Sequence, residues 1–272
     1  MGVVGTGTVG SGIAQVVLQA GFNLIWESRK KKSLEDGLKK IERNLLKSMS
    51  EKEKDKLLGN LKTSTDLKDL AEADLVVEAV VENLDIKKII FSELDEICPP
   101  ETIISSTSSS LSITEISDGL RNPERVIGLH FFNPVPIMHL AEVAPTEKTS
   151  DDVIEKTTKI AEALNKTVVP VTDSPCYVVN RILMPYLNEA VLTLEEGVAK
   201  KEDIDTAARL GLNHPIGPLA LLDLIGLDVF LAIMNSLARR TKNPKFNVAS
   251  LVEKMVSEGK LGRKSGQGFY KY

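Results

Sequence analysis

A glycine-rich turn near the start of the chain is the clearest sign of chemistry in the sequence. Gly5, Gly7 and Gly10 follow a β-branched run and lead into a helical pattern. In that context Gly5 permits a tight turn, Gly7 lets backbone N–H groups approach a pyrophosphate, and Gly10 lets the helix pack close to its strand. Together with Thr8 and Val9, these glycines predict a dinucleotide site at a helix N-terminus. A tight turn without a ligand is the alternative.

Two further groups stand where parallel strands would end. The serine-rich segment 105–110 follows an apolar strand pattern, so its hydroxyls would either face a ligand crevice or cap the next helix. His130 ends another strand pattern and could act as a general base or as a structural hydrogen-bonding group. Glu142 lies in an apolar run, where an unpaired carboxylate is costly, and His130 is its natural partner.

Alternating strand and helix patterns over the first ~170 residues must position these groups. Strand patterns cover residues 23–27, 75–81, 102–106, 125–130 and 167–171, and helical patterns cover 34–49, 51–60 and 85–97. From about Tyr177 onward only amphipathic helices remain. We therefore predict a doubly wound, mostly parallel α/β domain over residues 1–173 and an all-α domain over 174–272.

Composition limits the classes of function. A chain of 272 residues with a formal charge of −4 fits two domains and gives no reason to expect nucleic-acid binding. We expect no membrane span, signal peptide or metal site, because no long apolar run, leader pattern or metal-like His and Cys spacing is present. Cys98 and Cys176 favour a reducing cytoplasm. The run before Gly5 is short, so the first strand is either clipped or begins upstream of Met1.

Several segments in one order resemble the 3-hydroxyacyl-CoA dehydrogenase family, most closely its monofunctional 3-hydroxybutyryl-CoA dehydrogenases. The resemblance covers essentially the whole chain and implies a Rossmann domain followed by a helical domain. Its segments are the glycine turn, Asp74–Asn83, the Ser109 segment, His130–Pro136, Val179–Arg181, Asn213–Leu219 and Gly262–Tyr270.

The resemblance implies a role for each catalytic position. His130 would take the hydroxyl proton while hydride leaves C3 of the substrate, and Glu142 would orient the imidazole and stabilise its protonated form. Ser109 and Asn180 would hydrogen-bond the substrate oxygen, with Asn180 contributed by the helical domain.

The resemblance also implies cofactor contacts, and the chain departs from the family at two nearby positions. Glu82, Lys87 and Ser109 would lie by the nicotinamide end of the cofactor. Thr107 stands where the family usually has an asparagine that contacts the cofactor. Cys176 stands where the family has a glycine, and a positive φ there would strain the cysteine.

The end of the second strand bears on the choice of cofactor. Relatives that use NAD usually carry an aspartate at the position of Ser28, where it binds the ribose 2′-OH and repels a 2′-phosphate. Here Ser28 and Arg29 stand instead, which favours NADP. Glu27 is one residue early and should point to the other face of the strand, although a shifted register would bring it to the ribose and favour NAD.

The resemblance further implies an acyl-CoA substrate and a homodimer formed through the helical domain, with the apolar stretches 182–194 and 219–237 in the interface. Two alternatives remain at this point. One is a related dehydrogenase of a hydroxy acid without CoA, and the other is a dinucleotide-binding protein that has lost activity.

Overall fold

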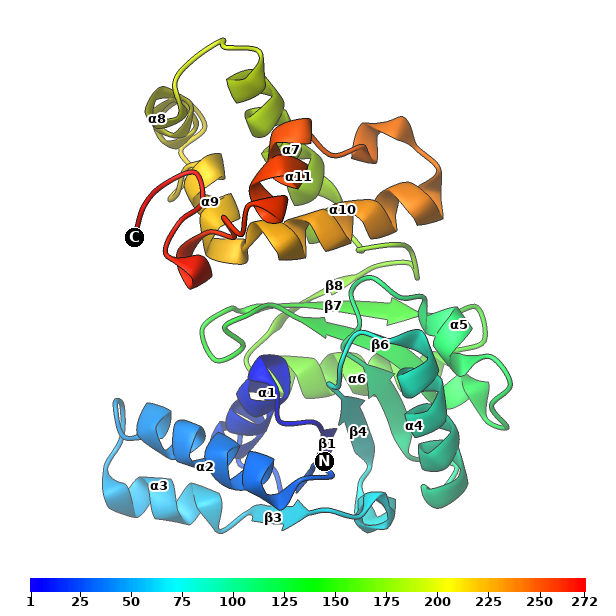
Figure 1. Ribbon diagram of the computed structural model, residues 1–272. Coiled ribbons are helices and arrows are strands. Elements are labelled where there is room, and N and C mark those ends of the chain that lie inside the picture. Colours follow the sequence, from blue (N-terminus) through cyan, green and yellow to red (C-terminus); the bar gives the residue numbers. More distant parts are fainter. The chain divides into compact units, whose positions relative to one another are not determined.

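The structure, a computed structural model, describes residues 1–272 and divides into two compact units, Met1–Ser174 and Pro175–Tyr272. The first unit contains one sheet with helices packed on it, and the second unit consists of helices, the loops that join them and a C-terminal segment (Figure 1). Each unit has its own hydrophobic core.

The first unit is built on an eight-stranded sheet with the order β3-β2-β1-β4-β5-β6-β7-β8. All neighbouring strands are parallel except β6 and β7, which are antiparallel. The predicted doubly wound, mostly parallel sheet is therefore confirmed. The strands are β1 (Gly2–Val4), β2 (Leu24–Glu27), β3 (Leu61–Ser64), β4 (Leu75–Glu78), β5 (Ile103–Ser106), β6 (Val126–Phe131), β7 (Leu140–Pro145) and β8 (Thr167–Pro170).

Helices cover both faces of this sheet because its central strands are apolar on both sides. Helices α1 (Thr8–Gln19), α2 (Lys31–Leu45) and α6 (Asp151–Ala163) share one core with Val3 and Trp26. Helices α4 (Leu84–Ile97) and α5 (Ile113–Ser117) share the opposite core with Val4 and Ile25, together with the 3₁₀ helix η1 (Leu67–Glu72). Successive strand residues thus alternate between the two faces.

Helix α2 packs unusually close to the sheet. A Cβ added to Gly37 would lie 2.5 Å from the indole ring of Trp26, so only glycine fits at that contact. The indole N–H of Trp26 donates to the carbonyl of Gly5 at 2.9 Å, which ties β2 to the glycine turn. The next helix, α3 (Glu51–Leu58), begins with a capping box formed by Ser50 and Glu53.

The second unit packs its helices around a separate apolar core. Its helices are α7 (Val179–Glu195), α8 (Lys201–Gly211), α9 (Pro218–Ile225), α10 (Leu227–Thr241) and α11 (Ser250–Ser257). The buried carboxylate of Asp223 on α9 accepts hydrogen bonds from the N–H groups of Phe269 and Tyr270, both at 2.9 Å, and so holds the C-terminal residues. No single helix is long and apolar enough to cross a bilayer. Helices α9 and α10 pass that test only as a pair, bent by 95°.

Candidate active site

The glycine turn lies between β1 and α1, where the strand order of the sheet reverses between β1 and β4. Gly5 has φ +108°, and a Cβ on Gly10 would lie 2.3 Å from the carbonyl oxygen of Gly5. A Cβ on Gly7 would meet nothing within 4 Å, and no side chain caps the helix that Gly7 begins. The helix N-terminus is therefore uncapped and has space beside Gly7, which fits the phosphates of a dinucleotide.

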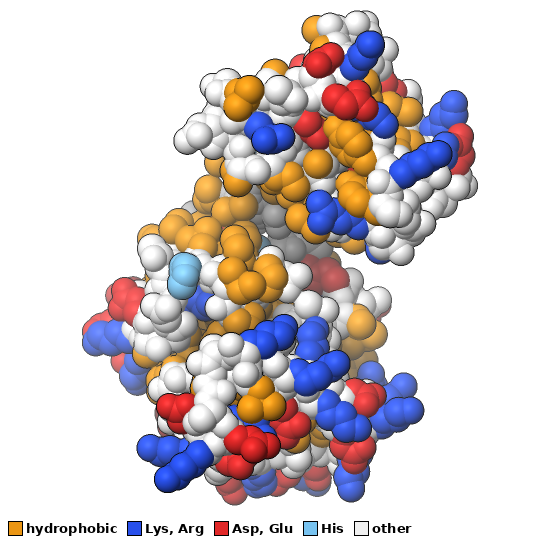
Figure 2. All heavy atoms as spheres, turned by 90° about the vertical axis from the view of Figure 1, so that its left-hand side faces the viewer, with side chains coloured by type: hydrophobic (Ala, Val, Ile, Leu, Met, Phe, Trp, Pro, Cys, Tyr) orange, Lys and Arg blue, Asp and Glu red, His pale blue; other side chains and the backbone are white.

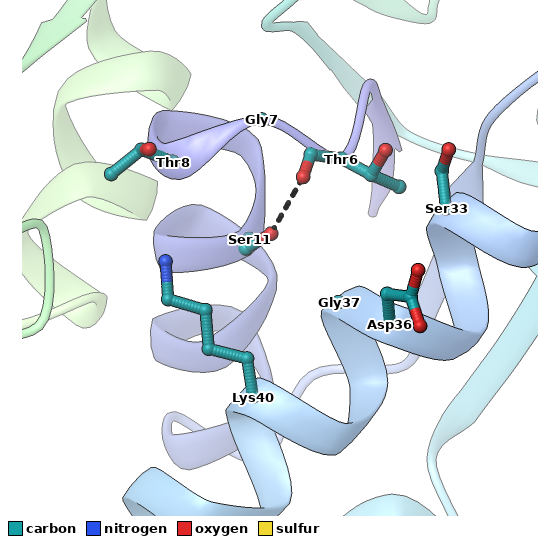
Figure 3. A pocket seen from close by; sticks show the side chains of 8 residues that line it. All are labelled: Thr6, Gly7, Thr8, Ser11, Ser33, Asp36, Gly37 and Lys40. Atoms are coloured by element: carbon teal, nitrogen blue, oxygen red, sulfur yellow. Dashed lines mark hydrogen bonds between the residues drawn. The ribbon is translucent and has the colours of Figure 1, made fainter.

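An open pocket of about 450 Å³ adjoins this turn. Figure 3 shows Lys40 extending from α2 along α1, and the hydroxyl of Ser11 donating to the carbonyl of Thr6 at 3.0 Å. Sequence reasoning identified the turn but missed the α2 wall. The α2 residues that line the pocket recur at the spacing of one helix face, namely Ser33, Asp36, Gly37 and Lys40. The sequence pattern of α2 could therefore have indicated this wall of the pocket. The lining residues are Thr6, Gly7, Thr8, Ser11, Ser33, Asp36, Gly37 and Lys40.

The carboxyl end of β2 continues this edge of the sheet. Ser28 is half-buried and Arg29 is exposed, and Arg29 forms no ion pair. Glu27 is only 2% exposed and stands opposite Val4 in the register of β1 and β2. Since Trp26 packs toward α2, Glu27 lies on the other face of the sheet, as predicted. Its burial raises the pKa of Glu27 to about 7.

His130 and Glu142 form a buried acid–base pair. Strands β6 and β7 are antiparallel, and their register sets the two residues directly opposite each other. His130 Nδ1 lies 2.8 Å from the Glu142 carboxylate, whose residue is fully buried. The Phe132 ring contacts the imidazole edge to face, with 4.6 Å between the ring centroids. The sequence analysis paired these two residues because an unpaired buried carboxylate is costly, and the structure brings them into contact.

Glu82 collects hydrogen bonds from the serine segment. Its Oε1 accepts from the hydroxyl of Ser108 at 2.6 Å and from the N–H and hydroxyl of Ser110 at 2.9 and 2.8 Å. Burial works to raise the pKa of Glu82, but Lys87 and these donors outweigh it and lower that pKa below its usual range. The hydroxyl of Ser109 is half-buried and makes no hydrogen bond within the protein, so it can accept or donate one to a ligand.

Lys87 lies deeper than its predicted role at the cofactor suggests. Its side chain is 1% exposed, and its ammonium group donates to both carboxylate oxygens of Glu78, at 2.6 and 2.8 Å. Glu82 lies 3.6 Å away, and Ser106 also donates to Glu78, at 2.7 Å. Sequence reasoning missed Glu78. A carboxylate inside the apolar strand pattern 75–81 needs a buried partner and could have indicated it.

The structure also places Thr107, Asn180 and Cys176, which the sequence analysis singled out. The N–H of Thr107 donates to the carbonyl of Glu78 at 3.0 Å, so Thr107 directly follows the β4–β5 edge. Asn180 is the second residue of α7 and belongs to the second unit, whereas the other proposed catalytic residues belong to the first. Cys176 has φ +64° and is buried, so the conformation that would strain a cysteine is present.

No group of three or more His, Cys, Asp and Glu side chains is arranged to hold a metal ion. The features that could hold a small molecule are the glycine turn with its pocket, the β2 edge and the serine segment. Beside them stands a histidine held by a carboxylate at the end of β6. This combination suits proton transfer next to a bound dinucleotide.

Comparison with known proteins matches this arrangement. A family model described as 3-hydroxyacyl-CoA dehydrogenase, NAD binding domain, matches residues 1–174. A second model, for the C-terminal domain of the same family, matches residues 177–272.

Individual relatives agree over their full length. The chain is 44% identical to the 3-hydroxybutyryl-CoA dehydrogenase of Clostridioides difficile, with 100% of this chain and 99% of that protein covered. It is 47% identical to a probable 3-hydroxybutyryl-CoA dehydrogenase of Deinococcus radiodurans, with the same coverage. The crystal structure of (S)-3-hydroxybutyryl-CoA dehydrogenase from Ralstonia eutropha superposes with a TM-score of 0.96 at 41% identity and covers 100% of this chain and 98% of that one. The chain belongs to the 3-hydroxyacyl-CoA dehydrogenase family.

Proposed function

We propose that this enzyme interconverts (S)-3-hydroxyacyl-CoA and 3-oxoacyl-CoA, with 3-hydroxybutyryl-CoA and acetoacetyl-CoA as its substrate pair. The observation that carries the proposal is the His130–Glu142 contact of 2.8 Å in a chain that also has an open dinucleotide turn. The names of full-length relatives support the CoA substrate. The names of these relatives favour an acyl-CoA substrate over a hydroxy acid without CoA. The intact His130–Glu142 pair argues against a dinucleotide-binding protein that has lost activity.

His130 and Glu142 of the first unit would carry out the proton transfer of the reaction. The chemistry that a bound nicotinamide supplies is hydride transfer to or from C3 of the substrate. Because Nδ1 of His130 faces Glu142, proton transfer with the substrate hydroxyl falls to Nε2. The buried Glu142 carboxylate stabilises the imidazolium that forms when His130 accepts the proton.

We propose that Ser109 and Asn180 bind the substrate oxygen. The Ser109 hydroxyl has no partner within the protein, which leaves it able to donate to an alkoxide-like oxygen. Ser109→Ala and Asn180→Ala should therefore lower kcat more than cofactor affinity. Steady-state kinetics together with a cofactor binding titration would check this, and Ser257→Ala, in the exposed last turn of α11, is the control. If only the cofactor dissociation constant rises, the two residues belong to the cofactor site.

We propose that NADPH is preferred over NADH. The exposed Arg29 can pair with a 2′-phosphate, and Ser28 lacks the charge that would repel it. A charge-assisted contact of this kind contributes roughly 1.5–3 kcal/mol, enough for at least about a tenfold preference.

Reduction of acetoacetyl-CoA, measured with NADPH and with NADH, tests the activity and the cofactor together. The expected result is turnover with both cofactors and a higher kcat/KM for NADPH. Ser28→Asp combined with Arg29→Ile should shift the preference toward NADH, because it removes a cation and adds a repelling charge. Lys39→Ile removes an exposed cation elsewhere on α2 and should leave the preference unchanged. A wild type that prefers NADH would refute the cofactor proposal while leaving the dehydrogenase intact.

We further propose a homodimer in the cytoplasm, formed through the second unit. Figure 2 shows apolar side chains at the surface of this unit. Ile182, Leu210 and Leu224 are exposed to 68%, 78% and 53%. Cys98 and Cys176 form no disulfide bond, which suits a reducing compartment. Sedimentation of the purified chain would measure the assembly, and a monomer at micromolar concentration would contradict it.

A further inference from the structure

Glu27 has an environment that the proposed reaction does not explain. It ends β2 with 2% of its surface exposed, and its Oε1 has no hydrogen-bond partner. A buried polar atom without a partner is costly, and a carboxylate more so than a neutral group. The structure offers no local reason to keep a carboxyl at this place, which points to a role that appears only when a ligand is bound.

The groups around Glu27 do not supply the missing hydrogen bond. The hydroxyl of its register neighbour Ser64 on β3 donates to Asp69 instead, at 2.5 Å. The charged groups that act on Glu27 come from two connecting segments and one helix: Arg29 after β2, Asp66 before η1, and Glu93 on α4. Arg29 is the only cation among them. Burial is the largest cause that raises the pKa of Glu27 to about 7, Arg29 acts against it, and the two acids add to it.

The position of Glu27 joins it to the dinucleotide edge. Its carbonyl accepts from the N–H of Gly5 in the glycine turn at 2.9 Å. The next two residues are Ser28 and Arg29, which the proposed function places at the 2′-position of the adenosine ribose. Arg29 acts electrostatically on the Glu27 carboxyl, so a charge that binds at Arg29 acts on it as well.

We propose that Glu27 is a proton-linked determinant of cofactor choice, whose carboxyl takes up a proton when a 2′-phosphate binds at Arg29. This inference rests on the proposed NADP site. A phosphate monoester brings roughly −1.5 to −2 charges, and it draws the Arg29 guanidinium into its own ion pair. Both effects disfavour an ionised Glu27, so NADP binding and protonation of Glu27 promote each other.

The sign of the coupling follows from this linkage. A ligand that takes up protons binds more weakly as pH rises through the range where the group titrates. NADP⁺ affinity should therefore fall by about three- to tenfold between pH 6 and pH 8, since one pKa unit corresponds to a tenfold change. NAD⁺ carries no 2′-phosphate, so its affinity should change much less over the same range.

Isothermal titration calorimetry of the full chain with NADP⁺ and NAD⁺ tests this without catalysis. Titrations at pH 7 in buffers of different ionisation enthalpy give the number of protons exchanged. Because Glu27 is about half-ionised when the pH equals its pKa, wild type should take up a net fraction of a proton, at most about half, with NADP⁺. Uptake with NAD⁺ should be close to zero.

Glu27→Gln keeps the shape of the side chain but cannot titrate, and Glu27→Met serves as a second variant. Both should lose the uptake with NADP⁺ and the fall in affinity from pH 6 to pH 8. The 2′-phosphate itself releases protons when it pairs with a cation, and that contribution is the same in wild type and variants. Glu35→Gln removes an exposed carboxylate on α2 and should behave as wild type.

The outcomes separate the two proposals. Tighter binding of NADP⁺ than of NAD⁺, with equal proton uptake in wild type and Glu27→Gln, would overturn this inference and leave the NADP site standing. Tighter binding of NAD⁺ would overturn both. Release of a proton on NAD⁺ binding that is lost in Glu27→Gln would place the ionised carboxylate on the ribose and overturn the inference as well.

Discussion

Two buried carboxyl groups of the sheet, Glu142 within β7 and Glu27 at the end of β2, differ in whether they have a partner. Glu142 is fully buried, and its carboxylate lies 2.8 Å from the imidazole of His130. Glu27 is also buried, but its Oε1 has no hydrogen-bond partner. A carboxylate held against a histidine can stabilise a charge that appears during turnover. A carboxyl without such a partner retains its proton to higher pH and responds to charges that arrive nearby.

His130→Gln should lower kcat by about 10²–10⁴ and leave cofactor binding nearly unchanged, the usual scale for removal of a general base. Glu142→Gln should also slow turnover, because it removes the charge that faces the imidazolium. Steady-state kinetics with acetoacetyl-CoA and a separate cofactor titration measure the two effects. His139→Gln changes an exposed histidine after β6 and is the control. Near-normal turnover in His130→Gln would refute the assignment.

At the scale of elements, β4 and α4 are joined by an ion pair inside the protein. Lys87 on α4 and Glu78 on β4 are 1% and 0% exposed, and Ser106 on β5 completes the hydrogen bonds of Glu78. Glu82 follows β4 and connects this pair to the serine segment. Lys87 thus helps to position Glu82, and through it the segment that carries Ser109, and its contact with the cofactor stays a prediction.

Lys87→Met should destabilise the protein by about 3–5 kcal/mol, because it leaves the Glu78 carboxylate buried without its partner. Urea unfolding followed by circular dichroism measures this free energy. Lys156→Met is the matched control: it breaks an exposed ion pair with Asp152 on α6, and it should cost no more than about 0.5 kcal/mol. If both variants lowered the free energy of unfolding equally, the buried ion pair would stabilise the protein no more than the exposed one.

The turn before α7 holds two residues in a strained backbone conformation. Cys176 and Tyr177 both have positive φ, +64° and +49°. A side chain in this region costs about 1–2 kcal/mol, and glycine avoids that cost.

Cys176→Gly should therefore be more stable than Cys176→Ala by about 0.5–1 kcal/mol, after the greater flexibility of glycine in the unfolded chain is subtracted. Both variants lose the buried thiol, so their difference reports the backbone. Thermal unfolding of the two variants measures it. The ordinary order, with alanine more stable, would show that the turn relaxes around the substitution.

The charge state of Glu27 acts at the scale of the whole molecule, because it enters the free energy of unfolding. The unfolded carboxyl releases its proton near the ordinary pKa of 4.5, whereas the folded one holds it to about 7. The folded state therefore binds more protons between these values, and its stability decreases as pH rises through that window. Above pH 7 the full penalty of the ionised, buried carboxylate is present.

Glu27→Gln should therefore raise the melting temperature at pH 8 more than at pH 5, since only the ionised form is penalised. Thermal unfolding at both pH values, with no cofactor present, measures the effect, and Glu35→Gln provides the exposed control. A shift that is the same at both pH values would mean that Glu27 does not titrate in this range.

Much of the first unit was predictable from local pattern. The apolar runs predicted β4, β5 and β6 to within a few residues, and the glycine spacing predicted the turn. Strand β3 was missed because Leu61–Ser64 is short, half-exposed and only partly apolar, so it has no clear alternation. Its place at the edge of the sheet comes from pairing with β2, which no local pattern contains.

The sequence by itself indicated which residues could bind a dinucleotide and which could transfer a proton. It also predicted the mostly parallel sheet that positions these residues. These follow from residue type, strand and helix period and the cost of burying charge, all of which are local properties. Only the tertiary structure decided that His130 and Glu142 are direct register partners, that Lys87 is enclosed with Glu78, and that Glu27 is left without a partner. Such facts depend on which distant strands and helices pack together, and burial and pairing exist only once they do.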